Sequence, residues 1–228
     1  KPFNFSFKGS KFSIYILGEF IGAIIDDAVY DDNDVLNFIK EHNNDIDRIH
    51  KLIRNSIGSF YIIIIDNNKA NILCSYSSPG LLHTKKDKVM YFSNTEKDIF
   101  KNFGKLSNLN EEILLTTVTS HQLLLRPPFK TIFNNIARLP SATGIIFGKD
   151  LNIKLDFQLI NEMPKKNYQP SSIKDGVNRF GFILENTMKL IVSYYHKNDK
   201  NLELSFSGGI DSSILMVAMK KTGLQFSS

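Results

Sequence analysis

The feature that most constrains this chain is a strand-like run, a glycine turn and an apolar helix in sequence near its C-terminal end. Residues 202–206 alternate apolar and polar side chains, which predicts a short strand. Gly208 and Gly209 then predict a turn, and residues 214–223 predict an apolar helix that ends with lysines and a glycine. Free backbone N–H groups and the positive end of the helix dipole meet at such a turn, so the sequence predicts an anion site there.

The residue types of the turn favour a polyphosphate over a single carboxylate. The glycines let the backbone approach a ligand closely, three serines can add hydroxyl donors, and Asp211 can hold a magnesium ion. The turn contains neither a Walker A motif nor a dinucleotide fingerprint. A plain helix cap is the simpler interpretation, but two glycines, one acid and three hydroxyls exceed what a cap needs.

The segment Ser-Gly-Gly-Ile-Asp-Ser-Ser, residues 207–213, resembles the pyrophosphate loop of the ATP pyrophosphatase group of enzymes. The resemblance implies cleavage of ATP between its α and β phosphates, transfer of AMP to a substrate oxygen, and attack of an amine on the adenylate. It implies ATP and Mg²⁺ as cofactors, with Asp211 as the metal ligand. The implied nucleotide-binding residues are Ser205, Phe206, Ser207, Gly208, Gly209, Asp211, Ser212 and Ser213.

Composition limits the remaining classes of function. The chain has 228 residues, of which 42% are hydrophobic and 22% charged, enough to bury one or two cores. A net charge of +5 with scattered lysines favours a solvated surface over a nucleic-acid footprint. The apolar runs are too short to span a bilayer, and no signal peptide is visible. We expect no nucleic-acid or membrane partner and a cytoplasmic location.

Cysteine and histidine give no sign of a metal site. The single cysteine, Cys74, excludes an internal disulfide and suits a reducing compartment. It lies in a predicted strand without a nearby histidine, so we expect a small core residue and not a nucleophile. The five histidines show no metal-ligand spacing.

Residues 12–159 predict strands with two or three helices. Strands are expected at residues 13–21, 58–66, 69–75, 88–93, 141–147 and 152–159. Helices are expected after a cap at residues 32–34, over residues 45–55, and from a cap at Asn110 to residue 124. The series favours an antiparallel meander packed by helices.

Short motifs in this part resemble the glutamine-hydrolysing half of asparagine synthetases. Gly18-Glu19-Phe20 is similar to that family's Asn-Gly-Glu segment, and residues 31–36, 58–66 and 131–140 are similar to three further motifs in the same order. The resemblance covers residues 13–223. It implies an α/β protein in which an Ntn-hydrolase-like αββα sandwich, an α+β domain, precedes the start of an adenine-nucleotide alpha-hydrolase-like parallel α/β domain. The expected domains are residues 1–160 and 172–228, both truncated, with a linker over residues 161–171.

Departures from the family indicate a degenerate glutaminase half. Leu17 stands where the family has an asparagine that forms the oxyanion hole, and an apolar side chain cannot donate a hydrogen bond to an oxyanion. The family's charged run appears as residues 75–80, which carry no charge. Gly18, Glu19 and Asp32 are the expected remnant of the glutamine pocket, although Asp32 is equally suited to cap a helix.

The linker is followed by a predicted long helix. Ser172 is the expected cap, Asp175 its capping-box partner, and residue 195 the approximate end. An apolar stripe lies on one face of this helix, and we interpret it as packed on the sheet of the second domain. The stripe consists of Val177, Phe180, Leu184, Met188 and Ile191.

These observations together predict an asparagine-synthetase-like, AMP-forming, ATP-dependent carbon–nitrogen ligase. It would adenylate a small-molecule or peptide carboxylate for attack by ammonia or an amine. The sequence leaves open whether the protein forms a homodimer. The alternative is an intramolecular amide-forming cyclase of the β-lactam synthetase or lasso peptide cyclase type. A non-catalytic binding or scaffold relative is a second alternative. The catalytic residues are unassigned.

Overall fold

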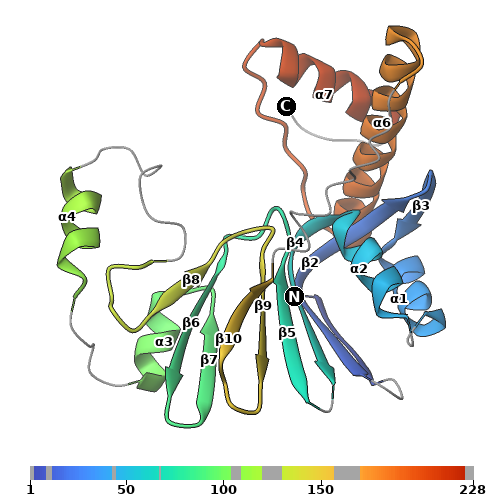
Figure 1. Ribbon diagram of the computed structural model, residues 1–228. Helices are drawn as coiled ribbons and strands as arrows, with labels where there is room; N and C mark the ends of the chain where they lie inside the picture. The colour runs from blue at the N-terminus through green and yellow to red at the C-terminus, as the bar shows by residue number, and fades with distance from the viewer. Residues whose placement is uncertain are drawn as a thin grey trace. The chain divides into compact units, whose positions relative to one another are not determined.

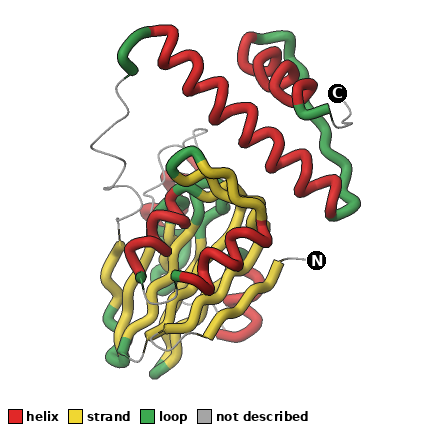
Figure 2. Tube along the Cα trace, turned by 90° about the vertical axis from the view of Figure 1, so that its right-hand side faces the viewer, coloured by secondary structure: helices red, strands yellow, loops and turns green. Residues whose placement is uncertain are grey.

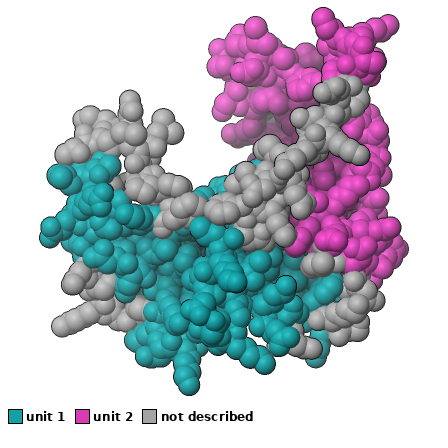
Figure 3. Space-filling view, viewed as in Figure 1, with its two compact units in different colours: residues 1–19, 59–163 teal, residues 20–58, 164–228 magenta. Residues whose placement is uncertain are grey.

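The computed structural model describes residues 3–8, 12–42, 45–66, 68–103, 109–119, 130–156 and 170–223. Within these residues the chain forms two antiparallel sheets and six helices (Figure 1). The fold is therefore mixed α and β, as the sequence predicted. The chain divides into unit 1, residues 1–19 and 59–163, and unit 2, residues 20–58 and 164–228 (Figure 3). Among the helices described, none is long and apolar enough to cross a membrane.

The larger sheet has seven strands. Its order is β1-β2-β4-β5-β9-β10, with β3 paired to β2 beside this path. The strands are β1 (Phe3–Lys8), β2 (Phe12–Ile25), β3 (Ala28–Asp31), β4 (Ser56–Asp66), β5 (Lys69–Cys74), β9 (Gly144–Gly148) and β10 (Ile153–Asp156). In β2, Phe12, Ile14 and Ile16 are buried and the residues between them are not, which is the two-residue period of a strand with one face on the core.

The smaller sheet packs on the larger one inside unit 1. Its order is β7-β6-β8, from β6 (Leu81–Lys86), β7 (Val89–Ser93) and β8 (Ala137–Leu139). Leu81 and Leu139 of the smaller sheet share a core cluster with Ile72 and Ile145 of the larger one. Helix α3 (Glu96–Phe103) contributes Ile99 to a cluster with β6. Helix α4 (Glu111–Thr119) completes the described helices of this unit.

Figure 2 draws the helices of the chain in red. Unit 2 contains those not yet described. They are α1 (Asp32–Glu41), α2 (Ile46–Arg54), α6 (Ile173–Lys197) and α7 (Ile210–Lys221). The C-terminal half of α6 is buried against β2, where Leu190 and Tyr194 pack with Ile21. Two ion pairs hold α6 to the β3 region: Lys197 Nζ lies 2.8 Å from Asp32 Oδ1, and Arg179 pairs with Asp27.

Local capping signals in the sequence predicted several helix starts. Asp45 caps α2, and Asn110 accepts a hydrogen bond from Ile113 N at 3.2 Å at the start of α4. The expected end of α4 near residue 124 lies outside the described residues. Ser172 caps α6 by accepting from Asp175 N at 3.1 Å, and the Asp175 carboxylate accepts from Ser171 N at 2.9 Å.

Two predictions about these helices need correction. The cap of α1 is Asp31, whose carboxylate accepts from Asn33 N and Asp34 N at 2.8 Å each, so Asp32 is the first helical residue. The predicted core stripe of α6 is wrong at its N-terminal end, where Val177 is 63% and Phe180 59% exposed. Only the C-terminal part of the helix packs on β2, where Ile191 of the stripe lies against the cluster of Ile21, Leu190 and Tyr194; tertiary contacts and not the period alone decide which residues are buried.

Cys74 lies between the two sheets and is fully buried. Burial raises the pKa of its thiol to about 12, only partly offset by a hydrogen bond with Ser78. Because the thiolate is the reactive species, we expect DTNB to label the native protein at least about 100-fold more slowly than the urea-unfolded protein. The chain has no other cysteine, so the absorbance change reports this thiol alone. Comparable rates in the two states would contradict the burial.

His83, on β6, is 9% exposed, and burial lowers its pKa. As the pH falls, the unfolded state therefore takes up a proton at this residue at a higher pH than the folded state does. The free energy of unfolding then falls as pH drops below about 6.5, by at most about 1.4 kcal/mol per pH unit. We expect urea titrations of His83→Gln to show a smaller loss between about pH 7.5 and 5.5 than the wild type shows. An equal loss in both proteins would assign the pH dependence to other groups.

Candidate functional site

The run before the glycine turn is not a regular strand. Within the described residues 202–207, only Glu203 forms a bridge. The strand predicted from the alternation of Leu202, Leu204 and Phe206 is therefore wrong in extent. Alternation supplies one apolar face, but a strand also needs a hydrogen-bonded neighbour along its length. Ser205 and Phe206 are exposed in this segment.

Helix α7 begins directly after the glycines with a free N-terminus. Gly209 is the N-cap residue, and no side chain of the described chain caps the helix. The first backbone bond of the turn runs from Ser213 N to Gly209 O at 3.0 Å. The N–H groups of the first helical residues, Ile210 to Ser212, therefore have no side-chain cap, and the partial positive charge of the helix end is not compensated by one. This arrangement suits an anion.

Three serine hydroxyls gather around the Gly209 peptide. Ser207 Oγ lies 3.2 Å from Ser212 Oγ and accepts from Gly209 N at 3.4 Å. Ser212 Oγ and Ser213 Oγ donate to Gly209 O at 3.0 and 2.8 Å. Ser212 is buried, whereas Ser207 is exposed. The hydroxyls predicted from sequence to act together are thus neighbours in the fold.

Gly208 is required by its backbone conformation and not by lack of space. Its φ is +77°, a region that residues with a Cβ rarely adopt, and a Cβ built on it would meet no atom within 4 Å. The approach to the loop at Gly208 is therefore open. This openness, beside an uncapped helix end, leaves room for a bulky anionic group.

Asp211, the predicted metal ligand, lies in the first turn of α7. Its side chain is exposed and has no hydrogen-bond or ion-pair partner in the described part of the chain. The described residues contain no group of three or more His, Cys, Asp or Glu side chains that could hold a metal ion. A single carboxylate fits Mg²⁺ as it binds beside phosphates, with water and phosphate oxygens as its other ligands.

The expected remnant of a glutamine pocket has structural roles in this fold. At Gly18, in unit 1, φ is +111° and a built Cβ would lie 2.5 Å from Ser59 O, so the glycine permits close approach of the β4 backbone. Glu19 is half-buried in β2. The Asp32 side chain, in unit 2, is only 13% exposed, and its ion pair raises the pKa of Lys197.

The segment over residues 75–80 is a packed turn. Ser75 Oγ accepts from Phe60 N at 3.1 Å, and Tyr61 donates its hydroxyl hydrogen to Gly80 O at 2.9 Å. Burial raises the pKa of Tyr61 to about 12, with Cys74 as a smaller cause. Leu17 is 40% exposed on β2 and offers no hydrogen-bond donor from its side chain. The residues that depart from the family motifs thus form a hydrogen-bonded turn, in which Ser75 and Ser78 are buried, and an apolar strand position.

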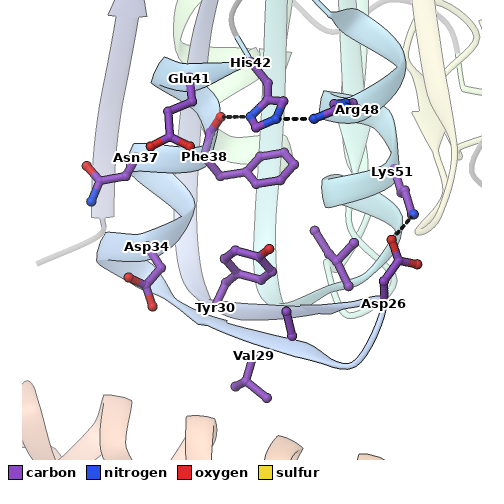
Figure 4. A pocket seen from close by; sticks show the side chains of 12 residues that line it. Asp26, Val29, Tyr30, Asp34, Asn37, Phe38, Glu41, His42, Arg48 and Lys51 are labelled. Carbon is purple, nitrogen blue, oxygen red and sulfur yellow. Dashed lines mark hydrogen bonds and ion pairs between the residues drawn. The ribbon is translucent and has the colours of Figure 1, made fainter.

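A cavity that the sequence did not reveal lies between α1 and α2 (Figure 4). Its α1 wall follows a helical spacing that could have been noticed, since Asp34, Phe38 and Glu41 are separated by four and three residues. The opposite wall comes from α2, and no local pattern predicts that the two helices face each other.

Comparison with known proteins adds no identification. No family model matches the chain, and the search of curated proteins finds no match. Function is therefore inferred from the loop residues and their geometry.

Proposed function

We propose that the protein is an AMP-forming, ATP-dependent carbon–nitrogen ligase of the asparagine-synthetase-like type. One observation carries the proposal: the sequence Ser-Gly-Gly-Ile-Asp-Ser-Ser leads directly into the uncapped N-terminus of α7, with its three hydroxyls gathered at Gly209. Such a helix end attracts phosphate oxygens, and hydroxyl donors beside it favour a polyphosphate over a lone carboxylate. The function follows from this loop together with its resemblance to pyrophosphate loops.

The proposed roles of the loop residues follow from their positions. The backbone of Gly208 and Gly209 and the hydroxyls of Ser207, Ser212 and Ser213 bind the β and γ phosphates. Asp211 holds Mg²⁺, which neutralises charge on the departing pyrophosphate. By resemblance to the family, Ser205 and Phe206 lie near the adenine. The substrate is a small-molecule or peptide carboxylate, and a cytoplasmic location suits an enzyme that consumes ATP.

The finer fold proposal is an Ntn-hydrolase-like sandwich followed by the start of a parallel nucleotide-binding domain. The packing of two antiparallel sheets in unit 1 supports the first part. The loop and α7 support the second, although the described residues form no parallel sheet there. In this assignment the glutaminase half is degenerate.

An intramolecular amide-forming cyclase is the second candidate. Asp32 is engaged by Lys197 and so is not available to hold a glutamine ammonium, and Leu17 cannot stabilise an oxyanion. An enzyme without glutamine hydrolysis needs another amine, and an amine within the substrate provides one. A non-catalytic scaffold relative is the third candidate. Within the described residues 202–207, which precede the loop, only Glu203 forms a β-bridge, so this segment is not the regular strand that the ligase assignment expects.

Exchange of labelled pyrophosphate into ATP tests the proposal. The intact protein is incubated with Mg²⁺, ATP and single carboxylates, namely aspartate, β-amino acids and candidate peptides. We expect exchange that depends on one carboxylate, because reversible adenylation is the proposed step. Exchange with aspartate indicates an asparagine-synthetase-like reaction, and exchange with a substrate that carries its own amine indicates a cyclase. If the folded protein neither catalyses pyrophosphate exchange nor binds ATP, the ligase and cyclase candidates are wrong and only the scaffold candidate remains.

A further inference from the structure

The cavity of unit 2 has a volume of about 770 Å³, large enough for a small organic ligand. Helices α1 and α2 form two of its walls, and the hairpin of β2 and β3 closes it from one side. Figure 4 shows the side chains of Tyr30 and Phe38 in the space between the two helices. Phe38 meets Tyr30 edge-on with ring centroids 5.6 Å apart and stacks on His42 at 4.2 Å. The cavity therefore has an aromatic interior.

The charged residues that the two helices contribute to the cavity are segregated by helix, and a fifth charged residue, Asp26, comes from the turn between β2 and β3. Asp34 and Glu41, which are acidic, come from α1, whereas Arg48 and Lys51, which are basic, come from α2. The cavity thus presents an acidic wall opposite a basic wall, with the aromatic rings between them. A ligand with charge of one sign would be matched by only one of these walls.

The basic wall is held in place but keeps donors for a ligand. Arg48 donates from Nη1 to His42 Nε2, and His42 Nδ1 lies 3.0 Å from Phe38 O. Arg48 Nε also lies 3.3 Å from Asp45 Oδ2, and Lys51 pairs with Asp26. Each cation has more N–H groups than these contacts use.

The acidic wall keeps acceptors. Glu41 has no hydrogen-bond or ion-pair partner among the described residues, and its side chain is exposed. Asp34 accepts one hydrogen bond, from Asp31 N at 3.3 Å, and is also exposed. A carboxylate can accept several hydrogen bonds, so both residues can bind a cationic group.

We propose that this cavity binds a small zwitterion with an apolar body, a free amino acid or a short peptide. Its ammonium group lies on the α1 wall at Glu41, its carboxylate on the α2 wall at Arg48 and Lys51, and its apolar body against Tyr30 and Phe38. Charge-assisted hydrogen bonds at both ends select for molecules that carry both groups. This inference goes beyond the proposed ligase function and needs no ATP for its test.

Titration calorimetry on the intact protein, without ATP, tests the site. The probes are L-phenylalanine, L-leucine and L-leucyl-L-phenylalanine, followed by the decarboxylated and deaminated analogues of the tightest one. We expect saturable one-to-one binding of at least one probe, and at least about tenfold weaker binding of either analogue, because each lacks one charge-assisted interaction. The absence of saturable binding for all three probes, or equal affinity for an analogue, would overturn the proposal.

Variants assign the two walls. Glu41→Gln should weaken binding of the zwitterion at least about tenfold and leave binding of the deaminated analogue unchanged, since that analogue has no ammonium group. Arg48→Gln should weaken binding of the zwitterion at least about tenfold and leave binding of the decarboxylated analogue unchanged, since that analogue has no carboxylate. Asp47→Asn is the matched control, because Asp47 is an exposed acid of α2 that does not line the cavity. If Glu41→Gln and Asp47→Asn have the same effect, the α1 wall does not bind the ammonium group and the proposal is wrong.

Discussion

Gly18→Ala is expected to lower the free energy of unfolding by about 3 kcal/mol or more. Two effects add at this position. Its φ of +111° is unfavourable for any residue with a side chain, and the new Cβ would lie 2.5 Å from Ser59 O and 3.0 Å from Phe60 Cα. These neighbours are backbone atoms of β4 and cannot rotate away, so the strands must separate. Urea denaturation of both proteins measures the loss.

Gly181→Ala is the control for this substitution. Gly181 lies inside α6, and a Cβ built there meets no atom within 4 Å. Alanine favours a helix interior by about 1 kcal/mol over glycine, so this variant should be as stable as the wild type or more so. A loss below about 1 kcal/mol for Gly18→Ala would show that β2 and β4 separate easily at this point. Failure of Gly18→Ala to accumulate as folded protein would be the extreme form of the expected result.

Asp211→Ala is expected to reduce ATP–pyrophosphate exchange at least about 100-fold, because it removes the carboxylate proposed to hold the magnesium ion that balances the developing charge. Stability should change little. Asp211 is exposed and its side chain makes no hydrogen bond or ion pair with another described residue, so the loss is limited to its interaction with the α7 dipole, about 0.3–1 kcal/mol. Exchange rates and thermal melting are measured on the same preparations.

Asp47→Ala separates a specific role from a general one. Asp47 is likewise an exposed first-turn acid, in α2, so its removal has the same effect on a helix dipole without touching the loop. Exchange should keep its wild-type rate in this variant. If Asp211→Ala keeps the wild-type exchange rate, Asp211 does not hold the metal ion. If both variants lose exchange equally, the loss comes from a general change of charge.

Helix starts were predictable because their signals are local. Asp45, Asn110 and Ser172 each lie within three residues of the N–H group that they bind, so the sequence contains the whole interaction. The start of α1 was misplaced by one residue because Asp31, Asp32 and Asp34 are all suitable caps. Only the geometry distinguishes among them.

Strands that depend on distant partners were harder to find. β6 was not predicted, since its alternation is weak and its pairing with β8 joins Leu82 to Arg138, far along the chain. Residues 202–206 show the opposite error, because their pattern is strand-like but they lack a ladder in the described structure. Strand formation depends on neighbours that a local pattern does not reveal.

The candidate site was predictable in part for the same reason. The residues of the glycine turn are consecutive, so their meeting at Gly209 follows from local geometry. The α1–α2 cavity brings Glu41 and Arg48 together from two helices, and its charge segregation exists only once those helices have packed. The structural role of Asp32 was also hidden, because Lys197 lies 165 residues away.

The short strand β3 determines how copies of the protein can meet. Its only partner in the described sheet is β2, which leaves one edge of its backbone unpaired by a strand. Acids flank it on both sides, with Asp26 and Asp27 before it and Asp31 and Asp32 at its end. Lys51, Arg179 and Lys197 neutralise three of these four acids, so charge alone does not protect the edge. The strand is short, and only four residues of backbone could form hydrogen bonds with a second copy. Self-association through the β3 edge is therefore disfavoured, and a homodimer of this protein would use another surface.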